Sequence, residues 1–237
     1  MKIALAVPKI IDGNIRHNIS KMKYFMYLAK SNGADLVCFG EAFLQGFNCL
    51  TWNYETDKDI AISTDSEIFK QICELSKKIG IDVMFGYNEL YSGSVYSSCA
   101  FIVNGVLHYN YRRISQGWKE ASKTDHRYKE GDSVNTFEYM GKKCVIALCG
   151  DLLDHPERFA LNEDILFWGV YVAWTVEEWE NGGKLEYARQ ANKCCKNTLY
   201  INSICEDDAF GGAEHFVNGN ITDELPLQNE DFIMVTV

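Results

Sequence analysis

The sequence predicts an α/β protein. Segments typical of buried strands alternate with segments of helical periodicity along the 237 residues. Two pairs of predicted strands are joined by short turns, Asn104-Gly105 and Met140-Gly141, of the kind that close hairpins. Because hairpins interrupt the alternation, the arrangement is not a plain doubly wound sheet. Residues 1–237 are predicted to form one domain, since no linker or low-complexity run divides them.

The first half of the chain opens with a strand and an amphipathic helix. Lys2 to Val7 is an apolar run, and residues 14–31 place apolar side chains on one face with lysines opposite. Asn32-Gly33 is a stop signal for that helix. Residues 34–40, "ADLVCFG", are predicted to be a second buried strand. The other elements expected in this half are a helix at 66–78, which Gly80 ends, and strands at 81–87, 95–103 and 106–112.

The second half continues the alternation after a long polar segment. Residues 115–132 show no clear period and are predicted to be a long functional loop. The elements expected beyond this loop are strands at 134–139, 142–148, 164–170, 198–204, 213–217 and 231–237, a short helix at 156–161, and a helix at 176–196 that Gly182-Gly183 interrupts.

Composition excludes several classes of protein. The formal net charge of −10 argues against a nucleic-acid binder, which would carry a basic face. The first apolar run is cut by Pro8, which is unlike a secretory signal, and no segment is long enough for a membrane-spanning helix. The chain has nine cysteines and no CxxC pair. We therefore expect free thiols, no membrane association and a reducing, cytoplasmic location.

Three of the predicted strands end in side chains that carry chemistry, namely Glu41, Arg113 and Cys149. Groups at the carboxyl ends of strands in an open α/β sheet converge on one crevice. There the carboxylate can take the thiol proton, the thiolate can attack a carbonyl, and the cation can hold the developing oxyanion. Gly150 allows a sharp turn and close approach to its N–H. The pattern favours an acyl-transfer site, although a cysteine at a strand end is more often inert packing.

Six segments in characteristic order carry a family resemblance: "FGEAFLQGF", "YSSCAFIVNGVLHYNYRR", "CGDLLDHPERF", "DILFWGVYVAW", "ARQANKCCKNTLYINS" and "GGAEHFVNGNI". In these segments, spread over residues 1–237, the chain resembles the nitrilase superfamily of carbon–nitrogen hydrolases. The resemblance implies an αββα sandwich, a Glu-Lys-Cys triad and hydrolysis of amides, ureido groups or nitriles without a metal or organic cofactor. It implies that Glu41 is the general base, that Cys149 is the nucleophile and that the Gly150 N–H belongs to the oxyanion hole. It also implies a homodimer or a larger homo-oligomer.

The sequence departs from the family at the lysine, where it has Arg113. Arginine and lysine are not interchangeable, so a second cation, Lys119 in "SQGWKEA", is the preferred replacement and Arg113 the alternative. Many members of the family also have a second glutamate that orients the lysine. Glu120 is the preferred candidate for that role, and Asp125 in "DHRYKEGD" is the other. Solvated surface charge is the plain alternative for all of these loop residues.

The substrate pocket is predicted from the family and from aromatic side chains. Residues of the "WGVYVAW" stretch line the acyl pocket in the family, which makes Val170, Tyr171 and Trp174 candidates, and Phe47 and Tyr96 are further ones. Core packing is the alternative for each aromatic ring. An aromatic, confined pocket would suit a small or flat substrate. True nitrilases often have Trp after the cysteine and many amidases have Tyr, so the glycine found here favours an amide over a nitrile.

Two other constellations receive less support from the sequence. His155 could form a Cys-His dyad with Cys149, but its place at the start of a short helix favours packing. A zinc site would need Cys194, Cys195, Cys205 and His215, and adjacent cysteines on a helix diverge.

The sequence thus predicts a hydrolase that cleaves a small amide or carbamoyl compound through a thioester on Cys149. No cofactor or metal is expected, and the expected partners are a small-molecule amide and further copies of the chain. Two alternatives stay open. One is an amide-forming acyltransferase that uses the same thioester. The other is an inactive homologue that binds a partner, which Arg113 supports and the intact Glu41 opposes.

Overall fold

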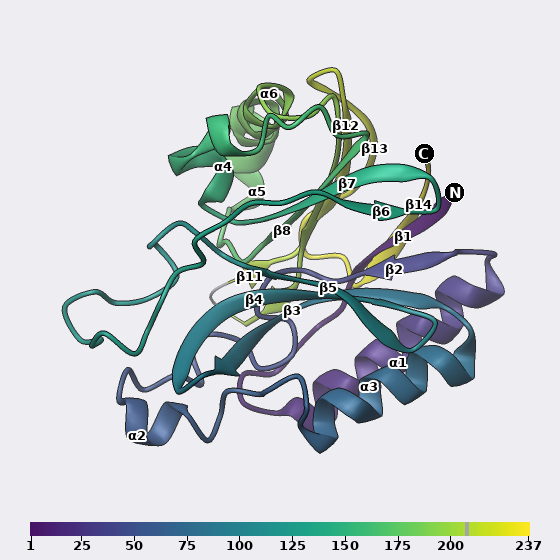
Figure 1. The fold of residues 1–237 in the computed structure, drawn as a ribbon. Coiled ribbons are helices and arrows are strands. Elements are labelled where there is room, and N and C mark those ends of the chain that lie inside the picture. The colour runs from purple at the N-terminus through teal and green to yellow at the C-terminus, as the bar shows by residue number, and fades with distance from the viewer. Residues whose placement is uncertain (207–208) are drawn as a thin grey trace.

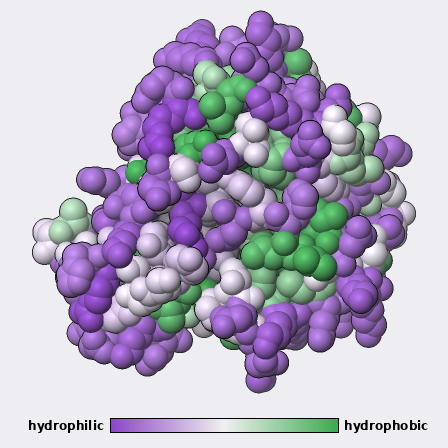
Figure 2. Space-filling model, in the orientation of Figure 1, coloured by the Kyte–Doolittle hydropathy of each residue, from purple (hydrophilic) through white to green (hydrophobic). Residues whose placement is uncertain are grey.

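The chain forms two six-stranded sheets that pack face to face between helices (Figure 1). The computed structural model describes residues 1–206 and 209–237. The two termini lie side by side because the last strand, β14 (Asp231–Thr236), pairs antiparallel with the first, β1 (Lys2–Val7). Hydrophilic residues cover most of the face shown in Figure 2, in keeping with the net charge of −10.

The first sheet takes its other strands and its helices from the N-terminal half of the chain. These elements are α1 (Ile15–Ser31), β2 (Leu36–Cys38), α2 (Tyr54–Asp57), α3 (Glu67–Ile79), β3 (Asp82–Tyr91), β4 (Ser94–Val103) and β5 (Val106–Arg112). The strand order is β14-β1-β2-β3-β4-β5. β1, β2 and β3 are parallel, and two antiparallel steps through β4 return β5 to the same direction. Helices α1 and α3 cover the outer face (Figure 1).

The second sheet follows from the C-terminal half. Its elements are β6 (Phe137–Tyr139), β7 (Lys142–Leu148), α4 (Asp151–Asp154), β8 (Ile165–Val170), α5 (Val176–Glu178), α6 (Lys184–Asn192), β9 (Asn197–Asn202), β12 (Ala213–Val217) and β13 (Asn220–Leu225). The strand order is β13-β12-β9-β8-β7-β6, in which β7, β8 and β9 are parallel. Helix α6 covers the outer face of this sheet. A short pair, β10 (Ile204–Cys205) and β11 (Ala209–Phe210), stands apart from both sheets.

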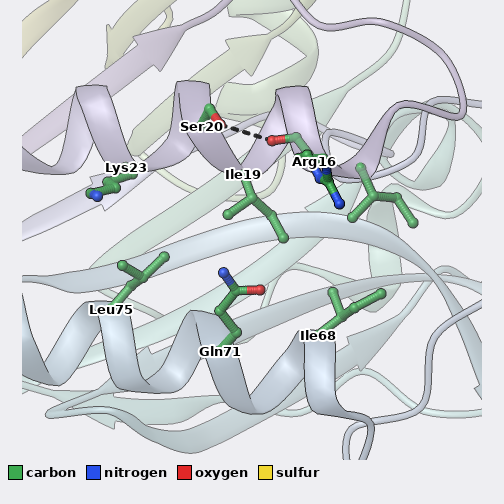
Figure 3. Close-up of a pocket in the computed structure, with 8 residues that line it drawn as sticks. Arg16, Ile19, Ser20, Lys23, Ile68, Gln71 and Leu75 are labelled. Atoms are coloured by element: carbon green, nitrogen blue, oxygen red, sulfur yellow. Dashed lines mark hydrogen bonds between the residues drawn. The ribbon is translucent and has the colours of Figure 1, made fainter.

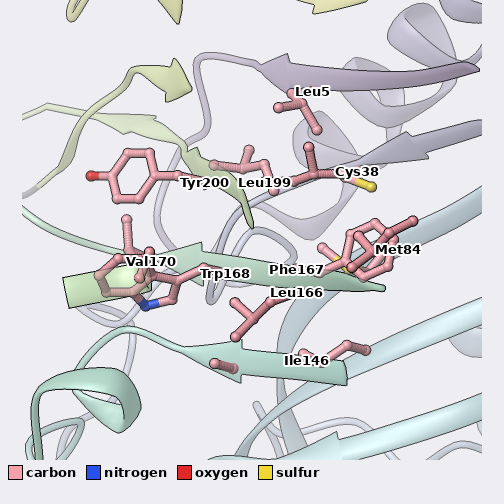
Figure 4. Close-up of a cluster of buried hydrophobic side chains, with 14 of the residues drawn as sticks. Leu5, Cys38, Met84, Ile146, Leu166, Phe167, Trp168, Val170, Leu199 and Tyr200 are labelled. Carbon is pink, nitrogen blue, oxygen red and sulfur yellow. The ribbon is translucent and has the colours of Figure 1, made fainter. Parts of the chain in front are cut away.

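Side-chain alternation along the strands divides the core into layers. On β1, Ile3, Leu5 and Val7 face the second sheet, whereas Ala4 and Ala6 belong to the layer beneath the helices. Figure 4 shows part of the layer between the sheets, where side chains from β1, β2 and β3 meet side chains from β7, β8 and β9. This shared apolar layer joins the two sheets into one packed body.

The two long helices have the caps that their sequences predict. Asn14 accepts a hydrogen bond from the His17 N–H at the start of α1, and Ser66 accepts one from the Phe69 N–H at the start of α3. Gly80 ends α3 in the left-handed conformation. A cavity of about 560 Å³ lies between α1 and α3 (Figure 3), and no candidate site residue predicted from the sequence lines it.

Most strands and helices predicted from the sequence are confirmed with small shifts of their ends. The short helix predicted at 156–161 is wrong, because α4 begins at Asp151 and only a 3₁₀ turn follows at Pro156–Arg158. The helix predicted at 176–196 is divided into α5, a π-helical turn at Trp179–Gly183 and α6.

Three elements were not expected from the sequence: α2, the β10–β11 pair and β13. β13 is an edge strand whose residues are mostly exposed, so it lacks the apolar alternation that marks a strand. Within the described residues, no helix has the length and apolar character needed to cross a membrane.

Candidate active site

Glu41, Arg113 and Cys149 meet where the two sheets end together. β2 and β5 run in the same direction, so Glu41 and Arg113 leave the first sheet at the same edge. Cys149 follows β7 in the second sheet. The Glu41 N–H donates to the Val170 carbonyl at 3.2 Å, which links the two sheets at this point. The convergence predicted from the three strand ends is therefore present, although it occurs between two sheets.

Two glycines let the backbones approach closely here. A Cβ on Gly40 would lie 3.0 Å from the Ser203 nitrogen and 3.1 Å from the Val170 oxygen. A Cβ on Gly86 would lie 2.6 Å from the Cα of Glu41. A larger residue at position 40 would push the Glu41 turn away from the second sheet, and a larger residue at position 86 would push it away from β3.

Glu41 and Arg113 form a buried ion pair. The Arg113 Nη1 donates to Glu41 Oε1 at 3.0 Å and to Oε2 at 3.3 Å. Ser97 Oγ also donates to Oε1, at 2.7 Å, and the Arg113 Nε donates to Ser115 Oγ at 2.7 Å. Glu41 is fully buried and Arg113 is 3% exposed. Each charge thus has its partner and further hydrogen bonds in a site that largely excludes water.

Cys149 sits on a sharp turn between β7 and α4. Its φ is +41°, a left-handed conformation that is uncommon for a residue with a side chain. The turn is held by the Cys149 N–H, which donates to the Gly169 carbonyl at 2.8 Å, and by the Trp168 indole, which donates to the Cys149 carbonyl at 2.9 Å. A backbone hydrogen bond from Tyr171 reaches the thiol. Strained turns of this kind occur at functional sites.

The backbone at Gly150 and Gly117 lies against the remaining nitrogen of the guanidinium. A Cβ on Gly150 would lie 2.8 Å from Arg113 Nη2, and a Cβ on Gly117 would lie 3.3 Å from it. Since Nε and Nη1 bind Ser115 and Glu41, Nη2 is the nitrogen that faces the Cys149 turn. The glycines leave space for a group to contact both the guanidinium and the turn.

Asp151 is a site residue that the sequence analysis did not assign. It is fully buried, and its carboxylate accepts four hydrogen bonds. Oδ2 accepts from the Tyr111 hydroxyl at 2.6 Å and from the Leu148 N–H at 2.9 Å. Oδ1 accepts from the Ile114 and Ser115 N–H groups at 3.1 and 2.9 Å. In the sequence, only its position two residues after Cys149 indicated that Asp151 could belong to the site.

The electrostatics keep the thiol protonated at rest. Burial and, after it, the Glu41 carboxylate raise the pKa of Cys149 to about 11, against the lowering effect of Arg113. Burial also raises the pKa of Glu41 above its usual range, against the lowering effect of Arg113 and Ser97. A thiol with such a pKa needs a base to take its proton during attack, and Glu41 is the carboxylate beside it.

The loop residues predicted to complete the site lie elsewhere. The Lys119 ammonium donates to the Tyr128 carbonyl at 2.6 Å and pairs with Glu130 at 2.6 Å. The cation that contacts Glu41 is Arg113, so the geometry favours Arg113 over the preferred candidate Lys119.

The two candidates for the second carboxylate are likewise engaged at the surface. Glu120 pairs with Lys123 at 2.7 Å, and Asp125 forms hydrogen bonds to Arg127. Neither is among the charges that act on Glu41 or Cys149.

The aromatic candidates divide into two groups. The Phe47 ring packs edge-on against Tyr171 with centroids 5.2 Å apart, so these two residues lie by the Cys149 turn that Tyr171 binds. Tyr96 instead lies over the guanidinium of Arg112, 4.9 Å from ring centroid to Cζ. Val170 is fully buried, and its carbonyl accepts the hydrogen bond from the Glu41 N–H.

Trp174 lines a separate cavity of about 360 Å³ together with Val172, Ala173, Glu178 and Tyr187. Its indole donates to the Tyr187 hydroxyl, and Tyr187 lies close enough to Cys149 for an electrostatic interaction between the two side chains. Tyr187 is a second candidate that the sequence analysis missed, since nothing in a helix-forming stretch distinguishes it.

The structure gives no support to the two less favoured sites, the Cys-His dyad and the zinc site. His155 lies between α4 and the 3₁₀ turn. His215 hydrogen-bonds Asn197 and Asp223, whereas Cys194 bonds the Pro156 carbonyl. In residues 1–206 and 209–237, no three His, Cys, Asp or Glu side chains are grouped to hold a metal ion.

Solved structures share this fold over nearly the whole chain. A glutamine-dependent NAD⁺ synthetase from Acinetobacter baumannii superposes with a TM-score of 0.80 at 20% identity, covering 98% of this chain and 44% of the synthetase. A mutant of the amidase from Nesterenkonia sp. AN1, with acrylamide added at its active-site cysteine, gives a TM-score of 0.80 at 15% identity, covering 100% of this chain and 93% of the amidase. These matches confirm the αββα sandwich.

Two curated relatives match by sequence. A nitrilase of Meyerozyma guilliermondii is 28% identical over 111 residues, 44% of this chain and 35% of the relative. An arylacetone-specific nitrilase of Alcaligenes faecalis is 27% identical over 146 residues, 56% of this chain and 40% of the relative. This chain thus spans well under half of the length of either relative. The family model described as carbon-nitrogen hydrolase matches residues 2–157, which is most of the chain and includes Glu41, Arg113 and Cys149, and the chain therefore belongs to the carbon–nitrogen hydrolase family.

Proposed function

We propose that the chain hydrolyses a non-peptide C–N bond of a small amide or carbamoyl compound through a thioester on Cys149. The observation that carries this proposal is the buried Glu41–Arg113 pair beside a strained cysteine turn. A buried charge pair costs desolvation energy, so its position next to a nucleophile points to chemistry more than to stability.

In the first half of the reaction, Glu41 takes the Cys149 proton as the sulfur attacks the carbonyl carbon. The π electrons of the carbonyl move to oxygen and form a tetrahedral intermediate. When the intermediate collapses, the C–N bond breaks and Glu41 passes its proton to the leaving nitrogen. The products are an amine or ammonia and an acyl group held on the sulfur.

In the second half, water attacks the thioester while Glu41 takes its proton. Collapse of the second tetrahedral intermediate breaks the C–S bond, releases the acid and returns the proton to Cys149. The high pKa of the resting thiol supports this cycle, since Cys149 needs Glu41 as a general base in the first step.

Arg113 and the Gly150 N–H are the proposed donors to the oxyanion in both halves. The Nη2 of Arg113 lies next to the Gly150 backbone, so one oxygen atom can contact both groups. Because an arginine side chain stays charged at all relevant pH values, it supplies electrostatic stabilisation and leaves every proton transfer to Glu41.

An amide is preferred over a nitrile because Gly150 leaves room beside the oxyanion position. The acyltransferase alternative uses the same thioester and differs only in the acceptor, an amine in place of water. A homo-oligomer and a cytoplasmic location remain part of the proposal.

The test is to trap the acyl group. Wild type would be incubated with small amides, carbamoyl compounds, glutamine and matched nitriles, quenched in acid and analysed by peptide mass spectrometry. The expected result is an acyl adduct on the peptide that contains Cys149. Release of acid with water, and of a new amide when an amine is added, separates hydrolysis from acyl transfer.

Cys149→Ala and Glu41→Gln serve as matched controls, because both keep the size of the site nearly unchanged. Neither variant should form the adduct while its circular dichroism stays native. Absence of any adduct or product in wild type across the panel, with reactive thiols confirmed by alkylation, would favour the binding-protein alternative.

A further inference from the structure

The 360 Å³ cavity lined by Trp174, Glu178 and Tyr187 is broadly open to solvent and lies beside α5 and α6. The Tyr187 ring stacks on Trp168 at 4.9 Å, and the Trp168 indole donates to the Cys149 carbonyl. Tyr187 also lies within range of the charge on Cys149. The Trp168 ring therefore connects the Tyr187 wall of the cavity to the cysteine turn.

The walls of this cavity have the chemistry of a cation site. The rings of Trp174 and Tyr187 meet edge to face, with centroids 5.8 Å apart and planes at 86°. Aromatic faces attract organic cations through the ring quadrupole, and Trp is the strongest of them. The third polar group is the Glu178 carboxylate, and no lysine or arginine is among the described residues that line the cavity.

Glu178 is held in place and stays ionised. Its Oε2 accepts from the N–H and the hydroxyl of Thr175, which forms the capping box of α5. These hydrogen bonds lower the pKa of Glu178, hence the carboxylate is charged at neutral pH. The capping bonds use Oε2, and Oε1 is available to a ligand.

We propose that this cavity is a subsite for an organic cation, a protonated amine or a guanidinium, that the substrate carries close to its scissile amide. The proposal rests on the proposed hydrolase function and narrows its substrate class. A net charge of −10 supports it, because an acidic surface raises the local concentration of cations and repels anionic substrates. The cation can belong to the leaving amine or to the acyl chain.

The first experiment compares matched substrates. One acyl group is offered as its N-butyl amide and as its N-(3-aminopropyl) amide, and a second pair places the ammonium or a methyl group at the end of the acyl chain. Wild type should prefer one of the two cationic amides by about fivefold to tenfold in kcat/KM, the size expected for an exposed cation–π and ion-pair contact. Which pair shows the preference tells which side of the amide enters the cavity.

Glu178→Gln tests the carboxylate with little change of structure, because glutamine also completes a capping box. The variant should lose the preference for the cation and retain turnover of the neutral amide. Glu177→Gln is the control: Glu177 is the exposed neighbour on α5, does not line the cavity, and should keep the preference.

A second readout does not require turnover. 1,3-Diaminopropane should slow alkylation of Cys149 by iodoacetamide in wild type but not in Glu178→Gln, and 1,3-propanediol should protect neither. If neutral and cationic amides are cleaved equally and the diamine does not protect, the subsite is refuted while the hydrolase stands. If no amide is cleaved but the diamine protects in a Glu178-dependent manner, the subsite stands and hydrolysis fails.

Discussion

Arg113 changes what the cation of this site can do. A lysine ammonium is one point charge on a flexible stem, whereas the guanidinium is a planar fork with several donors. Here Nη1 holds Glu41, Nε holds Ser115 and Nη2 faces Gly150. In the proposed mechanism, this single side chain orients the base and leaves one nitrogen for the oxyanion. Arginine in place of the family's lysine is compatible with an active site as long as Glu41 performs every proton transfer.

The role of this cation can be tested against that of Lys119. Arg113→Met should lower kcat/KM by about 100-fold to 1,000-fold, the usual cost of losing an oxyanion donor. Arg113→Lys should retain part of the activity, because an ammonium can still pair with Glu41. Lys119→Met should stay within about twofold of wild type in steady-state assays, since Lys119 pairs with Glu130. Equal losses in Arg113→Met and Lys119→Met, both natively folded, would return the role to Lys119.

The pKa of Cys149 gives a second prediction at this scale. Thiolates are the reactive form, so iodoacetamide labelling of wild type should rise with an apparent pKa near 11. Glu41→Gln should shift this pKa downward, because it removes a negative charge that disfavours the thiolate. The variant should therefore be labelled faster than wild type at a fixed pH of about 8 to 10, a range that includes the ordinary thiol pKa. Its amide turnover should nevertheless be lost.

Peptide mass spectrometry can follow that labelling, with the other cysteines as internal references. Cys99 and Cys144 are buried and bear raised pKa values, so their labelling should not respond in the same way. An upward shift of the Cys149 profile in Glu41→Gln would show that the carboxylate is not the group that acts on the thiol.

At the scale of the elements, Asp151 connects the end of β7 to the segment that follows β5. Its carboxylate binds the Leu148 N–H at the end of β7 and the Ser115 N–H just beyond β5, so it fixes the cysteine turn relative to the arginine. An amide in its place would turn one acceptor into a donor that faces other donors. Asp151→Asn should thus destabilise the fold by about 1–3 kcal/mol and lower kcat at the same time.

Urea unfolding and steady-state kinetics of Asp151→Asn would measure both effects. Tyr111→Phe is the matched comparison, since it removes one donor to the same carboxylate and leaves the other three in place. It should cost less than Asp151→Asn in both assays. Unchanged stability and kcat in Asp151→Asn would mean that the four hydrogen bonds do not set the geometry of the site.

Glu214 on β12 links pH to the stability of the second sheet. It is 1% exposed, and Oε1 accepts from the Trp179 indole of the π-helical turn at 3.1 Å. Burial raises its pKa well above the usual range, so the folded state holds a proton that the unfolded state has released. Between those two pKa values the folded state binds more protons, and stability falls as pH rises.

Glu214→Gln should remove that penalty while keeping the acceptor for Trp179. The variant should match wild type near pH 4 (about the ordinary glutamate pKa) and gain on it as pH rises, by up to about 1.4 kcal/mol per pH unit until the folded pKa is reached. Urea unfolding of both proteins across this range gives the difference directly. A gap that is constant or shrinks with pH would show that Glu214 is ionised in the folded state.

The contrast between what the sequence predicted and what it missed follows from how local each feature is. Buried strands and their last residues are encoded over six or seven positions, which is why Glu41, Arg113 and Cys149 could be placed together. The path of residues 115–132 depends on distant partners: Glu55 pairs with Arg127, and Asp57 accepts a hydrogen bond from the Tyr128 hydroxyl. No local period in the sequence reports these contacts. The choice between Lys119 and Arg113 therefore needed the structure.

At the scale of the whole molecule, the candidate site lies at the junction of the two sheets. Glu41 and Arg113 belong to one sheet and Cys149 to the other, so the geometry of the proposed reaction exists only while the two sheets are packed together. The apolar layer between them holds that packing. Phe101 of the first sheet and Phe167 of the second are both fully buried in it, with ring centroids 5.6 Å apart.

The shared layer predicts that the sheets unfold as one unit. Phe167→Ala should lower the free energy of unfolding by about 3–5 kcal/mol, because it opens a cavity between the sheets. Far-UV circular dichroism, tryptophan fluorescence and residual Cys149 activity should still change together, in a single transition. Tyr24→Ala, at a position on α1 that is 60% exposed, should leave the midpoint nearly unchanged. Loss of activity in a transition that precedes loss of secondary structure would instead show that the sheets separate first and that residues 1–237 do not behave as one cooperative domain.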